Sequence, residues 1–127
     1  MADAIALIDD LFFQAKVRET AKRTGITIET ATTGEQLLKA AAASPAAVIL
    51  VDLNAKQGAL DAVERLCAQT KQALQPGGQG NPRRVIAFLS HVQTDLAERA
   101  RAAGCQDVMP RSKFTQNLAE ILRGAKV

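Results

Sequence analysis

Three carboxylates stand at the ends of short apolar runs in this chain. Asp9 and Asp10 follow the run Ala4–Ile8, and Asp52 closes the run Ala47–Val51. A short continuous apolar run that stops at a carboxylate is typical of a buried parallel strand whose carboxyl end opens into a ligand crevice. Three carboxylates in one crevice would repel one another unless a cation or a proton came between them. The pattern therefore predicts a site for a hard divalent cation and, with it, phosphate chemistry.

The same acidic residues suit a magnesium ion and a phosphoryl group. Mg²⁺ takes oxygen ligands and usually needs only one or two carboxylates, which Asp9, Asp10 and Asp52 supply. A carboxylate can also act as a nucleophile and form an aspartyl phosphate, and Asp52, alone at its strand end, is the candidate. Helix N-capping is the competing interpretation of Asp9 and Asp10, but it explains one of the pair better than both.

Two further residues could act on a phosphoryl group at Asp52. Ser90 follows the apolar run Val85–Leu89, so its hydroxyl could reach a phosphoryl oxygen. Arg111 lies just beyond the last predicted strand, where a guanidinium could clamp the same group with two hydrogen bonds. Taken alone, Ser90 would be interpreted as a serine that stabilises a turn, and Arg111 would be interpreted as a solvated loop residue. His91 could titrate near neutral pH, although a lone His at a strand end is more often a plain surface residue.

Apolar periodicity predicts five strands that alternate with five helices and so position these residues. The predicted strands are Ala4–Ile8, Ile26–Ala31, Ala47–Asp52, Val85–Leu89 and Asp107–Met109. The predicted helices are Leu11–Thr24, Gly34–Ala43, Ala59–Leu74, Thr94–Ala103 and Phe114–Leu122. Between the third helix and the fourth strand, the Gly- and Pro-rich segment Gln75–Pro82 predicts an exposed connection.

This alternation predicts an α/β fold with a parallel sheet. Right-handed crossovers favour a doubly wound three-layer sandwich, the flavodoxin-like (βα)5 fold with strand order 2-1-3-4-5. In that order the first and third strands are neighbours at the topological switch point, where ligands bind outside the carboxyl ends. Asp9, Asp10 and Asp52 all fall at that point.

The composition narrows the class of protein. The 127 residues fit one compact domain, and 47% hydrophobic with 23% charged residues excludes a disordered chain. The net charge of +3 is mild and its basic residues are spread among acids, so no nucleic-acid partner is expected. The first apolar run is far too short to span a bilayer, which predicts a cytoplasmic protein without a membrane partner. Cys67 and Cys105, without Cys-x-x-Cys spacing, indicate reduced structural thiols.

Together these features resemble the receiver domain of two-component response regulators, the CheY-like family. Asp9 and Asp10 resemble the family's acidic pair, and Asp52 resembles its phosphoacceptor. Ser90 resembles its Thr/Ser switch residue, and Gly104–Arg111 resembles the segment leading into its invariable lysine. The four motifs stand in register along one α/β pattern, and the resemblance covers essentially the whole chain.

The resemblance implies a single, stand-alone receiver domain over residues 1–127. A histidine kinase or phosphotransfer protein would donate a phosphoryl group to Asp52 with Mg²⁺, whose ligands would be Asp9, Asp10, Asp52 and the backbone carbonyl of Asn54. The protein would be no enzyme beyond catalysing its own phosphorylation and dephosphorylation. Because no output domain follows, we expect output through an unknown partner protein, a homodimer or an omitted remainder of a longer protein.

The chain departs from the family at several positions. Arg111 falls where the family has Lys, with Lys113 as a substitute, and Ser112 replaces the Pro that usually follows. The loop after the phosphoacceptor keeps Asn54 but lacks the usual Met-Pro and Asp-Gly pairs, and Val108 replaces a common aromatic residue. These departures favour a second hypothesis, a pseudo-receiver that acts as a phosphorylation-independent interaction module.

A flavodoxin-like cofactor enzyme is a third and weaker hypothesis. Flavin sites usually need aromatic stacking, and the chain has no Trp or Tyr. The Asp-x-His-x-x-Gly motif of cobalamin-binding domains is absent, as is a Gly-x-Gly-x-x-Gly turn after the first strand. The sequence therefore predicts no organic cofactor.

Overall fold

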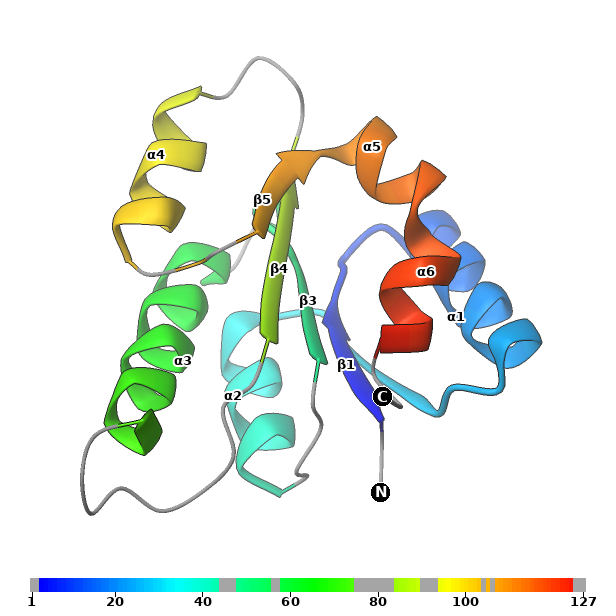
Figure 1. Ribbon diagram of the computed structural model, residues 1–127, viewed down its shortest axis with the longest axis horizontal. Helices are drawn as coiled ribbons and strands as arrows, with labels where there is room; N and C mark the ends of the chain where they lie inside the picture. The colour runs from blue at the N-terminus through cyan, green and yellow to red at the C-terminus, as the bar shows by residue number, and fades with distance from the viewer. Residues whose placement is uncertain are drawn as a thin grey trace.

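The computed structural model describes residues 3–43, 48–55, 58–74, 84–89, 94–103, 105 and 107–124, and its strands form one parallel sheet (Figure 1). The strands are β1 (Ala4–Leu7), β2 (Ile28–Ala31), β3 (Val48–Asp52), β4 (Arg84–Leu89) and β5 (Asp107–Pro110). Their order across the sheet is β2-β1-β3-β4-β5. This order confirms the predicted flavodoxin-like α/β fold, with β1 and β3 adjacent at the switch point.

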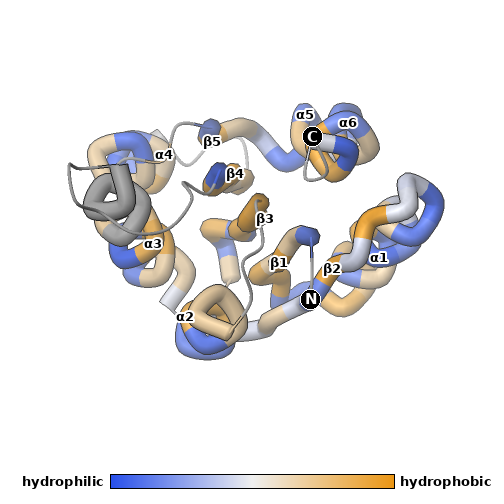
Figure 2. Tube along the Cα trace, turned by 60° about the horizontal axis from the view of Figure 1, so that its bottom comes forward, coloured by the Kyte–Doolittle hydropathy of each residue, from blue (hydrophilic) through white to orange (hydrophobic). Residues whose placement is uncertain are grey.

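Helices cover both faces of the sheet and complete the three layers. Within the described residues they are α1 (Leu11–Thr24), α2 (Gly34–Ala43), α3 (Ala59–Leu74), α4 (Thr94–Ala102), α5 (Arg111–Gln116) and α6 (Leu118–Arg123). Helices α1, α5 and α6 lie on one face, and α2, α3 and α4 lie on the other (Figure 2). The bounds of the first three helices are those predicted from apolar periodicity.

The closing helix differs from the prediction of one helix over Phe114–Leu122. Two short helices, α5 and α6, meet at Asn117, whose φ of −103° and ψ of 8° interrupt the helix. The Asn117 amide donates a hydrogen bond of 3.0 Å to the carbonyl oxygen of Lys113. Asn side chains compete in this way with the backbone bonds of a helix, which periodicity alone does not reveal.

The second strand begins two residues later than predicted. Gly25 ends α1 in the left-handed conformation at φ 75°, and the Ile26 N–H then bonds to the carbonyl oxygen of Ala21 at 2.9 Å. Ile26 therefore belongs to the turn that closes α1, although its side chain is buried as its type predicts. Strand β2 lies at an edge of the sheet.

Alternate residues of each central strand enter different cores. In β3, Ile49 and Val51 face the α2, α3 and α4 side, whereas Val48 and Leu50 face the α1, α5 and α6 side. Both faces of the strand are buried, which explains why its sequence is a continuous apolar run and not an alternating one. The apolar run continues to the carboxyl end of β3, where Asp52 is the first polar residue.

Candidate functional site

The acidic residues predicted from the sequence meet at the carboxyl ends of β1 and β3. Leu7 of β1 pairs with Val51 of β3, so the segments that follow both strands leave the sheet at the same edge. Asp9 and Asp10 lie between β1 and α1, and Asp52 is the last residue of β3. The structure thus confirms that the switch point gathers these three carboxylates.

Asp52 is buried, with only 4% of its surface exposed. Its Oδ1 accepts a hydrogen bond from the backbone N–H of Asn54 at 2.9 Å, and its Oδ2 lies 3.8 Å from a terminal nitrogen of Arg111. Burial raises the pKa of Asp52; the Asn54 N–H and Arg111 lower it, and the charges of Asp9 and Asp10 raise it further. Burial prevails because the two favourable contacts compensate only part of the lost hydration.

Asp10 caps a helix and also faces the crevice, while its predicted role as a metal ligand stays a prediction. Its Oδ1 caps α1 by accepting the backbone N–H groups of Phe12 and Phe13 at 3.0 and 3.3 Å. Its Oδ2 lies 3.5 Å from the same terminal nitrogen of Arg111 that approaches Asp52. Capping is therefore correct for Asp10, and it fixes the carboxylate so that the second oxygen faces the crevice.

Arg111 occupies the space between the two acids. It is the first residue of α5 and directly follows β5, and its guanidinium carbon lies 4.1 Å from the ring centroid of Phe13. Its Nη2 contacts both Asp10 and Asp52, while its buried Nε has no hydrogen-bond partner among the described residues. The sequence placed Arg111 correctly beside Asp52, but nothing in it predicted the contact with Phe13.

The remaining predicted residues have different outcomes. Asp9 is half-buried and close enough to Asp52 to raise its pKa. Asn54 contributes its N–H to Asp52, while the predicted role of its carbonyl as a metal ligand stays a prediction. Ser90 and His91 lie outside the described residues, as does the segment Gln75–Pro82.

Lys113, which the sequence offered as a substitute for the family's lysine, lies on α5 with an exposed side chain. The cation that reaches the carboxylates of Asp10 and Asp52 is instead Arg111. Because Arg111 begins the helix and Lys113 follows two residues later, the two side chains point in different directions from α5.

The oxygen donors suit a magnesium ion only in part. Among the described residues, no group of three or more His, Cys, Asp or Glu side chains lies close enough together to hold a metal ion. Two carboxylates with water and phosphate oxygens would still satisfy Mg²⁺, and Asp10 and Asp52 each direct one oxygen to the crevice. The donor chemistry therefore fits Mg²⁺ provided that the guanidinium of Arg111 withdraws.

Two positioning residues on α1 were not identified as such from the sequence. Phe13 supports the guanidinium of Arg111, and Gln14, only 8% exposed, donates a hydrogen bond of 3.0 Å to the carbonyl oxygen of Ile8. The second contact ties α1 to the end of β1 just before Asp9. A single glutamine on a helix is a weak indication of a contact with a strand end. The contact of Phe13 is with Arg111, almost a hundred positions away, which the local sequence does not show.

A shallow cavity of about 660 Å³ opens beside these residues and includes Asp10, Phe13, Lys16, Arg111 and Thr115 in its wall. At its rim Phe12 is 92% exposed, which is unusual for a large apolar side chain. The acidic crevice therefore borders an open, partly apolar surface and not a closed chamber.

Two other predictions concern the rest of the chain. Cys67 and Cys105 are both described, and both are buried thiols outside any disulfide, as predicted. Among the described helices, none combines the length and apolar character needed to cross a membrane.

Comparison with known proteins was informative at the level of structure. No protein-family model and no curated protein sequence matches this chain. The receiver domain of NtrX from Brucella abortus matches with a TM-score of 0.74 at 14% identity, covering 96% of both chains. A response regulator protein from Burkholderia pseudomallei, with a phosphorylated aspartic acid, a calcium ion and citrate, matches with a TM-score of 0.74 at 20% identity over 97% of this chain and 68% of that one.

A third match is a chain from the co-crystal structure of the Saccharomyces cerevisiae histidine phosphotransfer signaling protein Ypd1 and the receiver domain of its downstream response regulator Ssk1. Its TM-score is 0.74 at 16% identity, over 94% of this chain and 87% of that one. The chain has the receiver-domain fold. In this receiver fold, the carboxyl ends of β1 and β3 bring Asp10 and Asp52 to 3.5 and 3.8 Å from the same nitrogen of Arg111. The likeness at such low identity concerns the fold, and the site has to be argued from its own residues.

Proposed function

We propose that this receiver-fold protein accepts a phosphoryl group on Asp52 from a histidine kinase or a phosphotransfer protein. The observation that carries the proposal is the position of Asp52 at the carboxyl end of β3, beside Asp10 and in contact with Arg111. Burial of a carboxylate to this degree costs stability, and costs of this kind gather at functional sites.

The proposed reaction transfers one phosphoryl group between two side chains. An oxygen of the Asp52 carboxylate forms a bond to phosphorus while the bond from phosphorus to the donor histidine nitrogen breaks. The electron pair of the broken bond remains on the imidazole, which takes up a proton. Because only the ionised carboxylate attacks, the Asn54 N–H and Arg111, which lower the pKa of Asp52 against the effect of burial, favour the reactive form.

Charge neutralisation is the second requirement. Mg²⁺, when bound, would neutralise charge on the phosphoryl oxygens, with Asp9, Asp10, Asp52 and the Asn54 carbonyl as its proposed ligands. Arg111, whose terminal nitrogen lies 3.8 Å from Asp52 Oδ2, would be the source of positive charge for these oxygens in place of the metal ion and not beside it. The proposed switch role of Ser90 rests on its place in the sequence after β4.

The similar structures support this proposal without deciding it. One of them is described with a phosphorylated aspartic acid, and another comes from a complex with a histidine phosphotransfer protein. By analogy, we propose that a kinase or phosphotransfer partner docks over the open cavity beside Asp10, and that output follows through a partner protein or a second copy of this chain. We expect this to take place in the cytoplasm, with no catalysis beyond the protein's own phosphorylation and dephosphorylation.

Acetyl phosphate provides a direct test of the chemistry. Incubated with acetyl phosphate and Mg²⁺, the wild-type protein should gain the mass of one phosphoryl group by intact-protein mass spectrometry. Asp52→Asn should gain none, and Asp61→Asn should behave as wild type, because Asp61 is an exposed residue of α3 paired with Arg65 at 3.1 Å. Absence of any gain in the wild-type protein would exclude the proposed phosphoacceptor.

A pseudo-receiver is the second candidate function, and one observation favours it. Arg111 already places one positive charge against Asp10 and Asp52, so part of the negative charge of the crevice is compensated without a metal ion. In that case the protein would bind its partners equally well as wild type and as Asp52→Asn. The mass-spectrometric assay separates the two functions, since a pseudo-receiver gains no phosphoryl group.

A further inference from the structure

The contacts of Arg111 carry an inference about how the acidic crevice binds a cation. One nitrogen of its guanidinium, Nη2, lies 3.5 Å from Asp10 Oδ2 and 3.8 Å from Asp52 Oδ2. A guanidinium stays charged at every pH at which proteins fold. A full positive charge thus already stands between the two carboxylates.

The oxygens that face Arg111 are also the ones that a metal ion would need. Asp10 Oδ1 is engaged by the backbone N–H groups of Phe12 and Phe13, and Asp52 Oδ1 is engaged by the N–H of Asn54. The Oδ2 atom of each of these two carboxylates is the one in contact with the guanidinium. A divalent cation and the guanidinium would therefore use the same two oxygens, and they would repel each other at such a distance.

We propose that Arg111 is a built-in cation that competes with a divalent metal ion for Asp10 and Asp52, and that its contact with Phe13 sets how tightly the metal binds. The inference rests on the proposed function, because it concerns the metal ion of that site. It predicts weak metal binding by the wild-type protein and tighter binding whenever the guanidinium is removed or loosened.

Phe13 holds the guanidinium in place through a well-supported ring. The ring lies 4.1 Å from the guanidinium carbon and contacts Phe88 and Phe114, with centroid distances of 5.4 and 6.0 Å. Phe88 and Phe114 are fully buried and stacked on each other at 4.1 Å. Because the Phe13 ring is held by its neighbours, movement of the Arg111 side chain away from the acids breaks the cation–π contact.

The backbone of Arg111 is fixed as well, so the competition concerns its side chain alone. The Arg111 carbonyl oxygen accepts a hydrogen bond of 2.9 Å from the Thr115 hydroxyl within the first turn of α5. The side chain is 39% exposed and borders the open cavity, which gives it room to turn outward. Metal binding then requires a change of rotamer and no rearrangement of the sheet.

Binding of Mn²⁺ alone, followed by electron paramagnetic resonance of the unbound ion, tests the proposal without phosphoryl transfer. Arg111→Met keeps an unbranched side chain and removes the charge. This variant should bind Mn²⁺ about tenfold or more tightly than wild type. Phe13→Leu should tighten binding roughly three- to tenfold, because it keeps the charge and removes the aromatic face.

Lys16→Ala is the matched control, since Lys16 borders the same cavity but forms no ion pair with the described residues. Its removal should change the affinity by less than about twofold, because an exposed charge is screened. Arg111→Ala serves as a second variant if Arg111→Met does not fold, which circular dichroism would reveal.

The proposal is overturned if the Arg111 variants bind Mn²⁺ no more tightly than wild type, or no more tightly than Lys16→Ala. It is overturned equally if neither wild type nor the variants bind Mn²⁺ at millimolar concentration. Failure of the proposed function has a different signature, which is the absence of a phosphoryl group on Asp52 whatever the metal affinity.

Discussion

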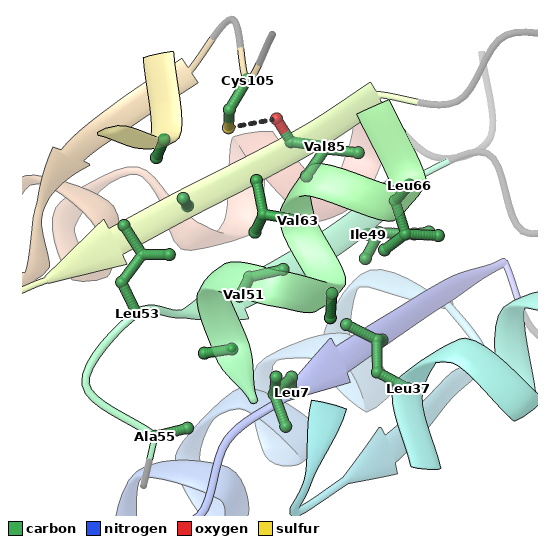
Figure 3. Close-up of a cluster of buried hydrophobic side chains, with 14 of the residues drawn as sticks. Leu7, Leu37, Ile49, Val51, Leu53, Ala55, Val63, Leu66, Val85 and Cys105 are labelled. Atoms are coloured by element: carbon green, nitrogen blue, oxygen red, sulfur yellow. Dashed lines mark hydrogen bonds between the residues drawn. The ribbon is translucent and has the colours of Figure 1, made fainter. Parts of the chain in front are cut away.

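The two faces of the sheet are packed with different kinds of side chain. The face under α2, α3 and α4 is filled by aliphatic residues and two cysteines, many of them alanine or valine, and part of it is drawn in Figure 3. The face under α1, α5 and α6 contains Phe13, Phe88 and Phe114, which contact one another. On this second face, the ring of Phe13 contacts Arg111, a charged residue of the candidate site.

This difference indicates that the site depends unequally on the two cores. The aliphatic face holds helices close to the sheet and supplies the burial that stabilises the fold. The aromatic face stabilises the fold too, but it also sets where the guanidinium of Arg111 lies relative to Asp10 and Asp52. Equal losses of stability on the two faces should therefore have unequal consequences for the crevice.

The largest expected effect is that of Phe114→Ala on the aromatic face. Phe114 is fully buried and stacked on Phe88, so its truncation should lower the free energy of unfolding by about 3–5 kcal/mol. It should also change Mn²⁺ affinity, because Phe13 loses a neighbour and Arg111 its fixed support. Urea unfolding and Mn²⁺ titration measure the two effects.

Leu37→Ala is the matched change on the aliphatic face, where Leu37 is fully buried. It should cost about 2–5 kcal/mol and leave the Mn²⁺ affinity of the folded protein unchanged. An equal shift in metal affinity for both variants would contradict the proposed difference between the faces.

A smaller loss is expected where α2 approaches the loop before α3. A Cβ atom added at Gly34 would collide with the backbone carbonyl of Gly58, which is itself held at a φ of 75°. Gly34→Ala should therefore destabilise the protein by about 1–3 kcal/mol, since backbone and not a flexible side chain must move. Gly124→Ala is the control, because a Cβ there meets only Arg84 at 4.0 Å; thermal unfolding should separate the two variants clearly.

Asp52→Asn should make the protein more stable at neutral pH. Burial raises the pKa of Asp52, so the folded state holds its proton more tightly than the unfolded state does, and stability falls as pH rises from the ordinary value of 3.8 through the folded value. An asparagine cannot ionise and can still accept the Asn54 N–H, which predicts a gain of about 1 kcal/mol at pH 7.

Unfolding measured at several pH values between 4 and 7 would check this prediction, because the gain should shrink toward the acidic end. Asp61→Asn, at an exposed position, should show no such trend. A loss of stability in Asp52→Asn at pH 7 would mean that the contact with Arg111 outweighs the cost of burial.

The smallest effect concerns the thiol of Cys105 on the aliphatic face. Burial raises its pKa to about 11, and its Sγ lies 3.4 Å from the carbonyl oxygen of Val85 (Figure 3). At pH 8 only about one part in a thousand is thiolate, so reaction with a disulfide reagent should be slow in the folded protein and fast in urea. Rapid reaction of Cys105 without urea would indicate that this face opens more readily than its burial implies.

The sequence predicted those features that depend on local patterns. Continuous apolar runs identified the strands, and their ends located Asp10 and Asp52 at one edge of the sheet, because a parallel topology leaves few alternatives. The sequence did not predict the break at Asn117, because buried apolar residues continue at helical spacing on both sides of it, from Phe114 to Leu118 and Leu122.

The features that were not predicted depend on contacts between distant residues. Phe13 stands in the predicted helix Leu11–Thr24, and nothing in the sequence of that helix shows that its ring supports Arg111 from another element. Asp10 caps α1 with one oxygen and contacts Arg111 with the other. A sequence does not show that the two oxygens of one carboxylate face different partners. Such pairings become visible only when the sheet brings the carboxyl ends of its strands together.

Mapping the modified residue shows directly whether Asp52 is the phosphoacceptor. After incubation with acetyl phosphate and Mg²⁺, borohydride reduction converts an aspartyl phosphate to homoserine, which peptide mass spectrometry then locates. We expect homoserine at Asp52 and at no other aspartate of the chain. Modification at a different aspartate, or none at all under conditions in which the protein is folded, would contradict it.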